Sequence, residues 1–94
     1  MTIQYSYQIK GILEDAQGNP FGFRVLLCTK DIFESVDVPG DLFNYETMRY
    51  LKFRLAVNPL LDVRKLPEHL QQQIRVPMNH YLDAWVEERM ANGD

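Results

Sequence analysis

Hydrophobic and polar residues alternate with a period of two in the first third of the chain. Apolar side chains occupy most odd positions of the segment 3–13 and again the odd positions of the segment 21–29. A strand directs successive side chains to opposite faces of a sheet, so each segment is predicted to be a β-strand with one apolar face. The intervening residues 14–20 are rich in turn formers, which makes the pair an antiparallel hairpin. The second strand is also apolar at Leu26 and Cys28, and we expect it to be central in the sheet.

The middle of the chain carries a mixed pattern. The segment 29–36 has apolar residues at the spacing of a single helical turn, and a Pro-Gly pair ends this turn at residues 39–40. A short helix is expected over 42–48. Strict alternation returns over 49–57, where the apolar odd positions are Leu51, Phe53, Leu55 and Val57. A helix would scatter these side chains around its circumference, so we predict a third strand over 49–57.

The last third of the chain has helical periodicity interrupted by prolines. Asn58 and Pro59 form a typical helix start, because asparagine caps free amides and proline at the first position loses no needed donor. Pro67 and Pro77 are predicted to mark kinks or tight corners between packed helices. The clearest apolar stripe, at positions i, i+3, i+4, i+7 and i+8, consists of Met78, Tyr81, Leu82, Trp85 and Val86. Trp85 lies at the centre of this stripe and is expected to anchor the core.

These elements predict one α+β domain covering residues 1–94. A small antiparallel sheet, built from the hairpin and the predicted third strand, is packed by helices over 59–91. A chain of 94 residues is long enough to fold alone. Its composition, 46% hydrophobic and 24% charged, is that of a globular domain.

Charge and cysteine usage narrow the possible environments. The net charge of −3 argues against a general nucleic-acid binder, which usually carries a basic excess. Cys28 is the single cysteine, so an intramolecular disulfide is impossible. The lack of disulfides and of a recognisable leader predicts a reducing, cytoplasmic location. No apolar run approaches the length of a membrane span, so no membrane partner is expected.

Catalytic and metal-binding motifs are missing from the sequence. His69 and His80 are eleven residues apart, whereas helical metal ligands lie three or four apart. Neither Ser6 nor Ser35 has the context of a hydrolase nucleophile, and no glycine-rich phosphate loop occurs. We therefore predict no metal, no cofactor and no catalytic residues. An enzyme with a spatially assembled site is the least favoured class.

A basic interval over 49–65 is the most distinctive charge feature. It contains Arg49, Lys52, Arg54, Arg64 and Lys65, interrupted by the single acid Asp62. Positive charge beside an aromatic side chain suits contacts with phosphates and bases. The same pattern also suits a solvated face whose long side chains cover apolar neighbours. Nucleic-acid binding through this interval is therefore the alternative function.

The favoured function is that of a small non-enzymatic module that binds a larger protein or complex. Five Tyr and five Phe exceed what one small core needs, and Tyr and Arg are favoured at interface centres. The predicted partner-binding residues are Tyr45, Arg49, Tyr50, Lys52, Arg54, Arg64 and Lys65. Short acidic chains of this kind include inhibitors and accessory subunits, some of them encoded by phages or mobile elements.

Overall fold

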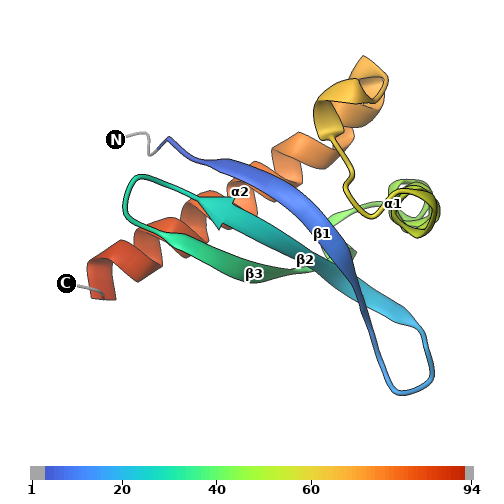
Figure 1. The fold of residues 1–94 in the computed structure, drawn as a ribbon, viewed down its shortest axis with the longest axis horizontal. Helices are drawn as coiled ribbons and strands as arrows, with labels where there is room; N and C mark the ends of the chain where they lie inside the picture. Colours follow the sequence, from blue (N-terminus) through green and yellow to red (C-terminus); the bar gives the residue numbers. More distant parts are fainter. Residues whose placement is uncertain (1–3, 93–94) are drawn as a thin grey trace.

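The first half of the chain forms an antiparallel sheet. The computed structural model describes residues 4–92, and the predicted start of the first strand at residue 3 lies outside them. Strand β1 (Ser6–Glu14) pairs with β2 (Pro20–Cys28), which confirms the predicted hairpin. Strand β3 (Phe33–Pro39) adds to the other side of β2. The resulting order β1-β2-β3 confirms that β2 is the central strand (Figure 1).

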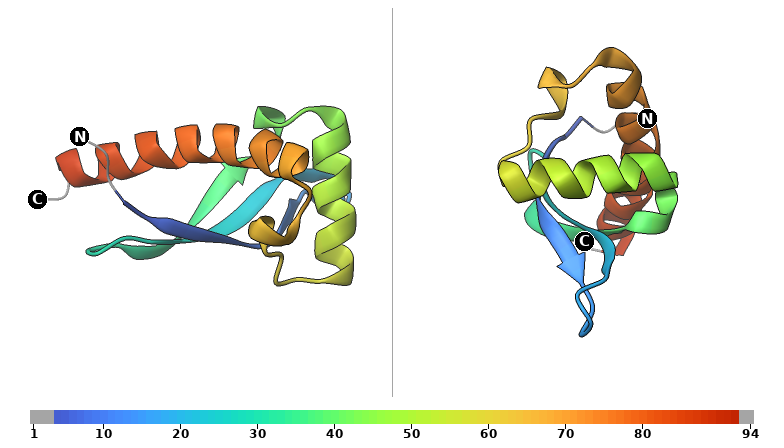
Figure 2. Two further views of the ribbon diagram at one scale, coloured as in Figure 1. Left: turned by 90° about the horizontal axis from the view of Figure 1, so that it is seen from above. Right: turned by 90° about the vertical axis from the view of Figure 1, so that its right-hand side faces the viewer.

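Two helices complete the α+β fold that the sequence predicted. Helix α1 spans Tyr45–Val57 and helix α2 spans Glu68–Asn92. A 3₁₀ turn, η1 (Gly40–Leu42), leads into α1, and a second one, η2 (Val63–Lys65), precedes α2. Helix α2 runs along one face of the sheet, while α1 crosses the end of α2 at a steep angle (Figure 2). The other face of the sheet carries no helix and looks toward the viewer in Figure 1.

The core lies between the sheet and α2. The register places Ile9, Val25 and Val36 side by side across the three strands, and all three are buried. Helix α2 faces them with side chains four residues apart, all fully buried, namely Ile74, Met78, Leu82 and Val86. This spacing confirms a helical apolar stripe in the C-terminal segment. Trp85 is only half-buried at the edge of the stripe, so it is not the central anchor that the sequence suggested.

The predicted third strand over 49–57 is wrong, because this segment belongs to helix α1. Asn44 caps the helix, since its side-chain oxygen accepts a hydrogen bond from the backbone N–H of Thr47 at 2.7 Å. The buried face of α1 consists of Thr47, Leu51 and Leu55, which are four residues apart. The Thr47 hydroxyl donates to the side-chain oxygen of Gln73 at 2.8 Å, so this buried polar group is satisfied by α2. The apparent alternation counted two exposed residues, Phe53 and Val57, as core.

The actual third strand, β3, lies where the sequence suggested a helical turn over 29–36 and a chain break. Val36 and Val38 are buried and Asp37 between them is exposed, which is the period of a strand. The strand has seven residues, and the helical spacing came from joining Ile32, which precedes it, to Phe33 and Val36 within it. Pro39 ends the strand at the sheet edge, where a proline costs no ladder hydrogen bond.

Pro67 lies in the short corner between η2 and α2, as predicted, whereas the assignments at Pro59 and Pro77 were wrong. Asn58 ends α1 instead of starting a helix, since its backbone N–H donates to the carbonyl of Arg54 at 2.7 Å. Pro67 precedes α2, and its carbonyl accepts hydrogen bonds from the first turn of the helix. Pro77 lies inside α2, which continues through it without the predicted break. The buried stripe on both sides of Pro77 holds the helix against the sheet despite the donor that proline lacks.

Candidate functional site

One side of α1 is a solvent-exposed row of large side chains. Tyr45, Arg49, Phe53 and Val57 follow one another at four-residue intervals, so they are neighbours along the helix surface. The exposed fractions are 78% for Tyr45, 65% for Phe53 and 70% for Val57. These four residues are called the α1 ridge. They lie on the side of α1 that points away from its buried face.

The α1 ridge is bordered by positive charge. Arg49 lies within it, and Lys52 is exposed beside it. Neither cation forms an ion pair with another residue in the range 4–92. Glu46, in the first turn of α1, is the neighbouring acid, at a position where the helix dipole favours a negative charge. The cations of the ridge are therefore available to an acidic group outside the chain.

The other residues of the predicted partner-binding set are not on this surface. Tyr50 and Arg54 are half-buried, and Tyr50 packs against the core. The Arg54 Nε is buried and has no hydrogen-bond partner among the described residues. Arg64 and Lys65 are exposed, but they belong to η2 and not to α1. The basic interval 49–65 is thus divided between two elements and is not one continuous stripe.

Phe53 and Val57 are the ridge residues that sequence reasoning missed. Both were assigned to a core-facing strand, although they are among the most exposed apolar side chains of the protein. The signal that marks them is the cap Asn44 followed by Thr47, Leu51 and Leu55 at helical spacing. Once that buried face is recognised, Phe53 and Val57 must lie on the opposite side of the helix.

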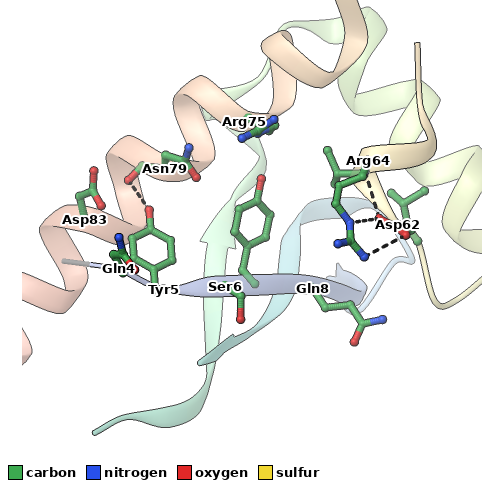
Figure 3. A pocket seen from close by; sticks show the side chains of 12 residues that line it. Gln4, Tyr5, Ser6, Gln8, Asp62, Arg64, Arg75, Asn79 and Asp83 are labelled. Carbon is green, nitrogen blue, oxygen red and sulfur yellow. Dashed lines mark hydrogen bonds and ion pairs between the residues drawn. The ribbon is translucent and has the colours of Figure 1, made fainter. Parts of the chain in front are cut away.

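A groove of about 830 Å³ forms a second candidate site, along the outer edge of β1 (Figure 3). Residues 4–8 line one side, and the segment 61–64 lines one end. Arg75, Asn79 and Asp83 line the opposite side, and their four-residue spacing puts them in one row along α2. Ser6 and Gln8 point away from α2, as Figure 3 shows.

The outer edge of β1 is open because the segment after α1 pairs with it only at Leu61 and then turns away. Leu61 makes an isolated antiparallel bridge with Ile9, so the chain pairs with this edge at a single position. The chain then turns into η2, since the Asp62 side chain accepts a hydrogen bond from the backbone N–H of Arg64 at 3.0 Å. The stretch of β1 before Ile9 therefore pairs with β2 on one side and with no strand of the described chain on the other. Such an edge presents free N–H and C=O groups.

Tyr7 of β1 and Tyr5, which precedes the strand, connect this edge to α2. The Tyr5 hydroxyl donates to the backbone carbonyl of Asn79 at 3.0 Å. Burial raises the pKa of Tyr5, and the nearby carboxylate of Asp83 raises it further. Burial also raises the pKa of Tyr7 to about 12, against the opposing positive charge of Arg75. The Tyr7 hydroxyl is buried and has no hydrogen-bond partner within the described residues.

Some of the charged side chains around the groove form an ion pair, and others do not. The Arg64 guanidinium lies 3.2 Å from the Asp62 carboxylate, and this hydrogen bond lowers the pKa of Asp62. Arg75 and Asp83, in contrast, form no ion pair with any residue between 4 and 92. Arg75 and Asp83 thus lie on the same side of the groove, about two helical turns apart, and neither has an ion-pair partner among residues 4–92.

A second hollow, of about 530 Å³, lies between β3 and the end of α2. Its charged groups satisfy one another, because Arg24 lies 3.1 Å from Asp37 and Arg89 lies 3.1 Å from Glu34. The Arg89 guanidinium also stacks 5.7 Å from the centre of the Trp85 ring. This hollow therefore looks like structural packing between helix and sheet.

No candidate metal site is assembled in the described part of the chain. No three side chains from His, Cys, Asp and Glu within residues 4–92 are placed to hold a metal ion. His69 and His80 are both exposed. Over the same range, neither helix is long and apolar enough to cross a membrane. Comparisons of the chain with family models, with curated proteins and with solved structures gave no match.

Proposed function

We propose that this protein is a small non-enzymatic interaction module that binds a larger protein, as an inhibitor or accessory subunit, through the α1 ridge. The observation that carries this proposal is the exposure of Tyr45, Phe53 and Val57 in one row on a well-capped helix. Large apolar side chains gathered in one exposed patch are typical of interaction sites, whereas single ones are ordinary.

The chemistry of the ridge specifies the kind of partner surface. An exposed helix with apolar side chains at regular spacing fits into an apolar groove. Arg49 and Lys52 would lie at the rim of that groove, where acidic residues of the partner would complement them. The partner is therefore a protein with an apolar groove bordered by carboxylates. Tyr45 and Arg49 are of the residue types that most often dominate binding energy.

The alternative, nucleic-acid binding through the interval 49–65, draws less support from the arrangement of its residues. Its cations are split between α1 and η2, and Arg64 is already paired with Asp62. The apolar side chains between Arg49 and Val57 also suit a protein groove better than a phosphate backbone. Retention of an oligonucleotide at physiological salt would favour the alternative.

The test uses a matched pair of exposed phenylalanines. Phe53 lies on the α1 ridge, while Phe33, which is 75% exposed, lies at the start of β3 away from it. The partner is first captured from cells that naturally produce the protein, then purified and titrated. Phe53→Ala and Tyr45→Ala should each weaken the complex by more than about 1 kcal/mol, and Phe33→Ala should leave it unchanged.

The melting temperature of each variant separates binding from folding. Because these side chains are exposed, the substitutions should leave the melting temperature close to that of the parent protein. If Phe33→Ala weakens the complex and Phe53→Ala does not, the interface is not on α1 and the proposal is wrong.

A further inference from the structure

The groove beside β1 offers a free strand edge with a defined length. Within the described chain, the edge is closed at Ile9 by the bridge to Leu61, and the open stretch consists of Ser6–Gln8 of β1, preceded by Gln4 and Tyr5, which also line the groove. The side wall is helix α2 (Figure 3). An edge strand flanked by a helix can accept an extended segment, whose main chain completes the ladder while alternate side chains face the helix.

The chain itself indicates the direction of the missing strand. Leu61 pairs with Ile9 in the antiparallel sense, so the segment that begins there runs from the Ile9 end of β1 toward the Gln4 end. Residues 62–65 leave that line to form η2. A ligand strand that continues along the same line is therefore also antiparallel to β1, which is the more stable pairing.

The unpaired charges on α2 determine which side chains such a strand needs. Arg75 and Asp83 line the same wall of the groove, and Figure 3 shows Asp83 at the end near Gln4 and Tyr5 and Arg75 nearer to Arg64. Eight residues of helix separate the two charges by about 12 Å. Four residues of extended chain cover about 13 Å, and residues four apart point to the same side of a strand. An acid and a base four residues apart therefore match Arg75 and Asp83.

We propose that the β1 groove binds an extended protein segment by strand addition, antiparallel to β1, with an acidic residue at Arg75 and a basic residue four positions later at Asp83. The acidic residue comes first because an antiparallel segment runs from the Tyr7 end of the groove toward the Tyr5 end, and it therefore passes Arg75 before Asp83. The buried Tyr7 hydroxyl adds an unused donor beside Arg75. This site is separate from the α1 ridge and does not depend on it.

Three capped heptapeptides test the proposal. The first is a Thr/Val strand sequence with Glu at its second and Lys at its sixth position. The second has the same composition with Glu and Lys exchanged, and the third is the first with alternate backbone nitrogens methylated. Each is titrated into the ¹⁵N-labelled full chain while amide shifts and hydrogen exchange are recorded. The first peptide should shift and protect amides within residues 4–8, and the exchanged peptide should bind roughly fivefold more weakly.

Substitutions in the protein should reverse the preference. The combination of Arg75→Glu with Asp83→Arg exchanges the two exposed charges, and it should make the exchanged peptide the tighter ligand. Lys30→Glu, at an exposed position between β2 and β3, is the matched control and should leave the original order of affinities unchanged. The affinities of the two peptides are compared for the same protein variant, so a small loss of stability in that variant cannot produce the reversed preference.

Four results would overturn the proposal. The methylated peptide would bind as well as its parent, or the two charge orders would bind equally, or none of the peptides would bind at millimolar concentration. In the fourth, the free protein would form dimers that already protect the amides of residues 4–8, which would assign the edge to a second copy of the chain.

Discussion

The helical assignment of residues 45–57 can be tested with Leu51 and Phe53, two large apolar residues that are two positions apart. In a strand, Leu51 and Phe53 would point to the same side and be buried together. In α1 they point to different sides, and Leu51 is fully buried while Phe53 is 65% exposed. Alanine at each position therefore separates the two structures, because the helix predicts a large loss at one position and a small loss at the other.

The magnitudes follow from the burial of each side chain. Leu51→Ala removes a fully buried side chain and leaves a cavity between α1 and the core, which costs about 2–5 kcal/mol. Phe53→Ala gives up the third of its side chain that is buried, roughly 60 Å², or about 1.5 kcal/mol as an upper bound. Alanine recovers part of this through its higher helix propensity, so the net loss should stay below about 1 kcal/mol.

Urea unfolding followed by far-ultraviolet circular dichroism measures both free energies. A domain of this size has about 5–15 kcal/mol of stability, so both variants should remain folded enough to measure. A loss of 2 kcal/mol corresponds to a drop of roughly 8–16 °C in Tm, which provides a second readout. If Phe53→Ala destabilises the protein as much as Leu51→Ala, the side of α1 that carries Phe53 is packed. The α1 ridge would then not exist as an exposed surface.

Three further substitutions test the packing of the sheet and the environment of the Tyr7 hydroxyl. A Cβ at Gly22 would lie 2.5 Å from the backbone carbonyl oxygen of Val38, so Gly22→Ala should cost about 1–3 kcal/mol of stability. A Cβ at Gly11 meets no atom within 4 Å, so Gly11→Ala should change stability little. Equal unfolding free energies for the two variants would contradict this packing. The raised pKa of Tyr7, about 12 against an ordinary value of 10.0, means that folding favours the neutral phenol, so the associated stability is present below pH 10 and is lost as pH rises toward 12. The Tyr7→Phe variant should therefore lose less unfolding free energy than the parent protein between pH 10 and pH 12, as measured by urea titration at each pH. If the two proteins show the same dependence of unfolding free energy on pH, the Tyr7 hydroxyl has the same pKa in the folded and unfolded states.

Much of the sheet and of α2 could be predicted from the sequence, because their signals are local. The alternation over the hairpin and the i, i+4 stripe around Met78 and Leu82 each have one period that fits one structure. Both segments pack against a single surface, so most of the apolar positions in the sequence are buried in the fold, with exceptions such as Phe21 and Trp85. The α+β class follows from these two elements alone.

Helix α1 and strand β3 were misassigned for the opposite reason. Along α1, apolar residues serve both the core and an exposed ridge, so Leu51 and Phe53 look alike in sequence although only Leu51 is buried. The deciding interaction is the Asn44 cap together with the contact from Thr47 to Gln73, twenty-six residues apart. Tertiary packing selects the helix there, and hydrophobic periodicity does not record it.

The residues of the two candidate sites also fall into those that the sequence indicated and those that only the fold revealed. Sequence alone drew attention to Tyr45, Arg49 and Lys52, because an aromatic residue near cations is visible in a linear pattern. It could not show that Phe53 and Val57 join them, nor that Arg75 and Asp83 stand over the open edge of β1. That groove brings together residues from opposite ends of the chain, and their proximity follows from how α2 folds back along the sheet. The sequence determined which segments alternate and which carry charge, and the tertiary structure decided which of those side chains face solvent and which meet.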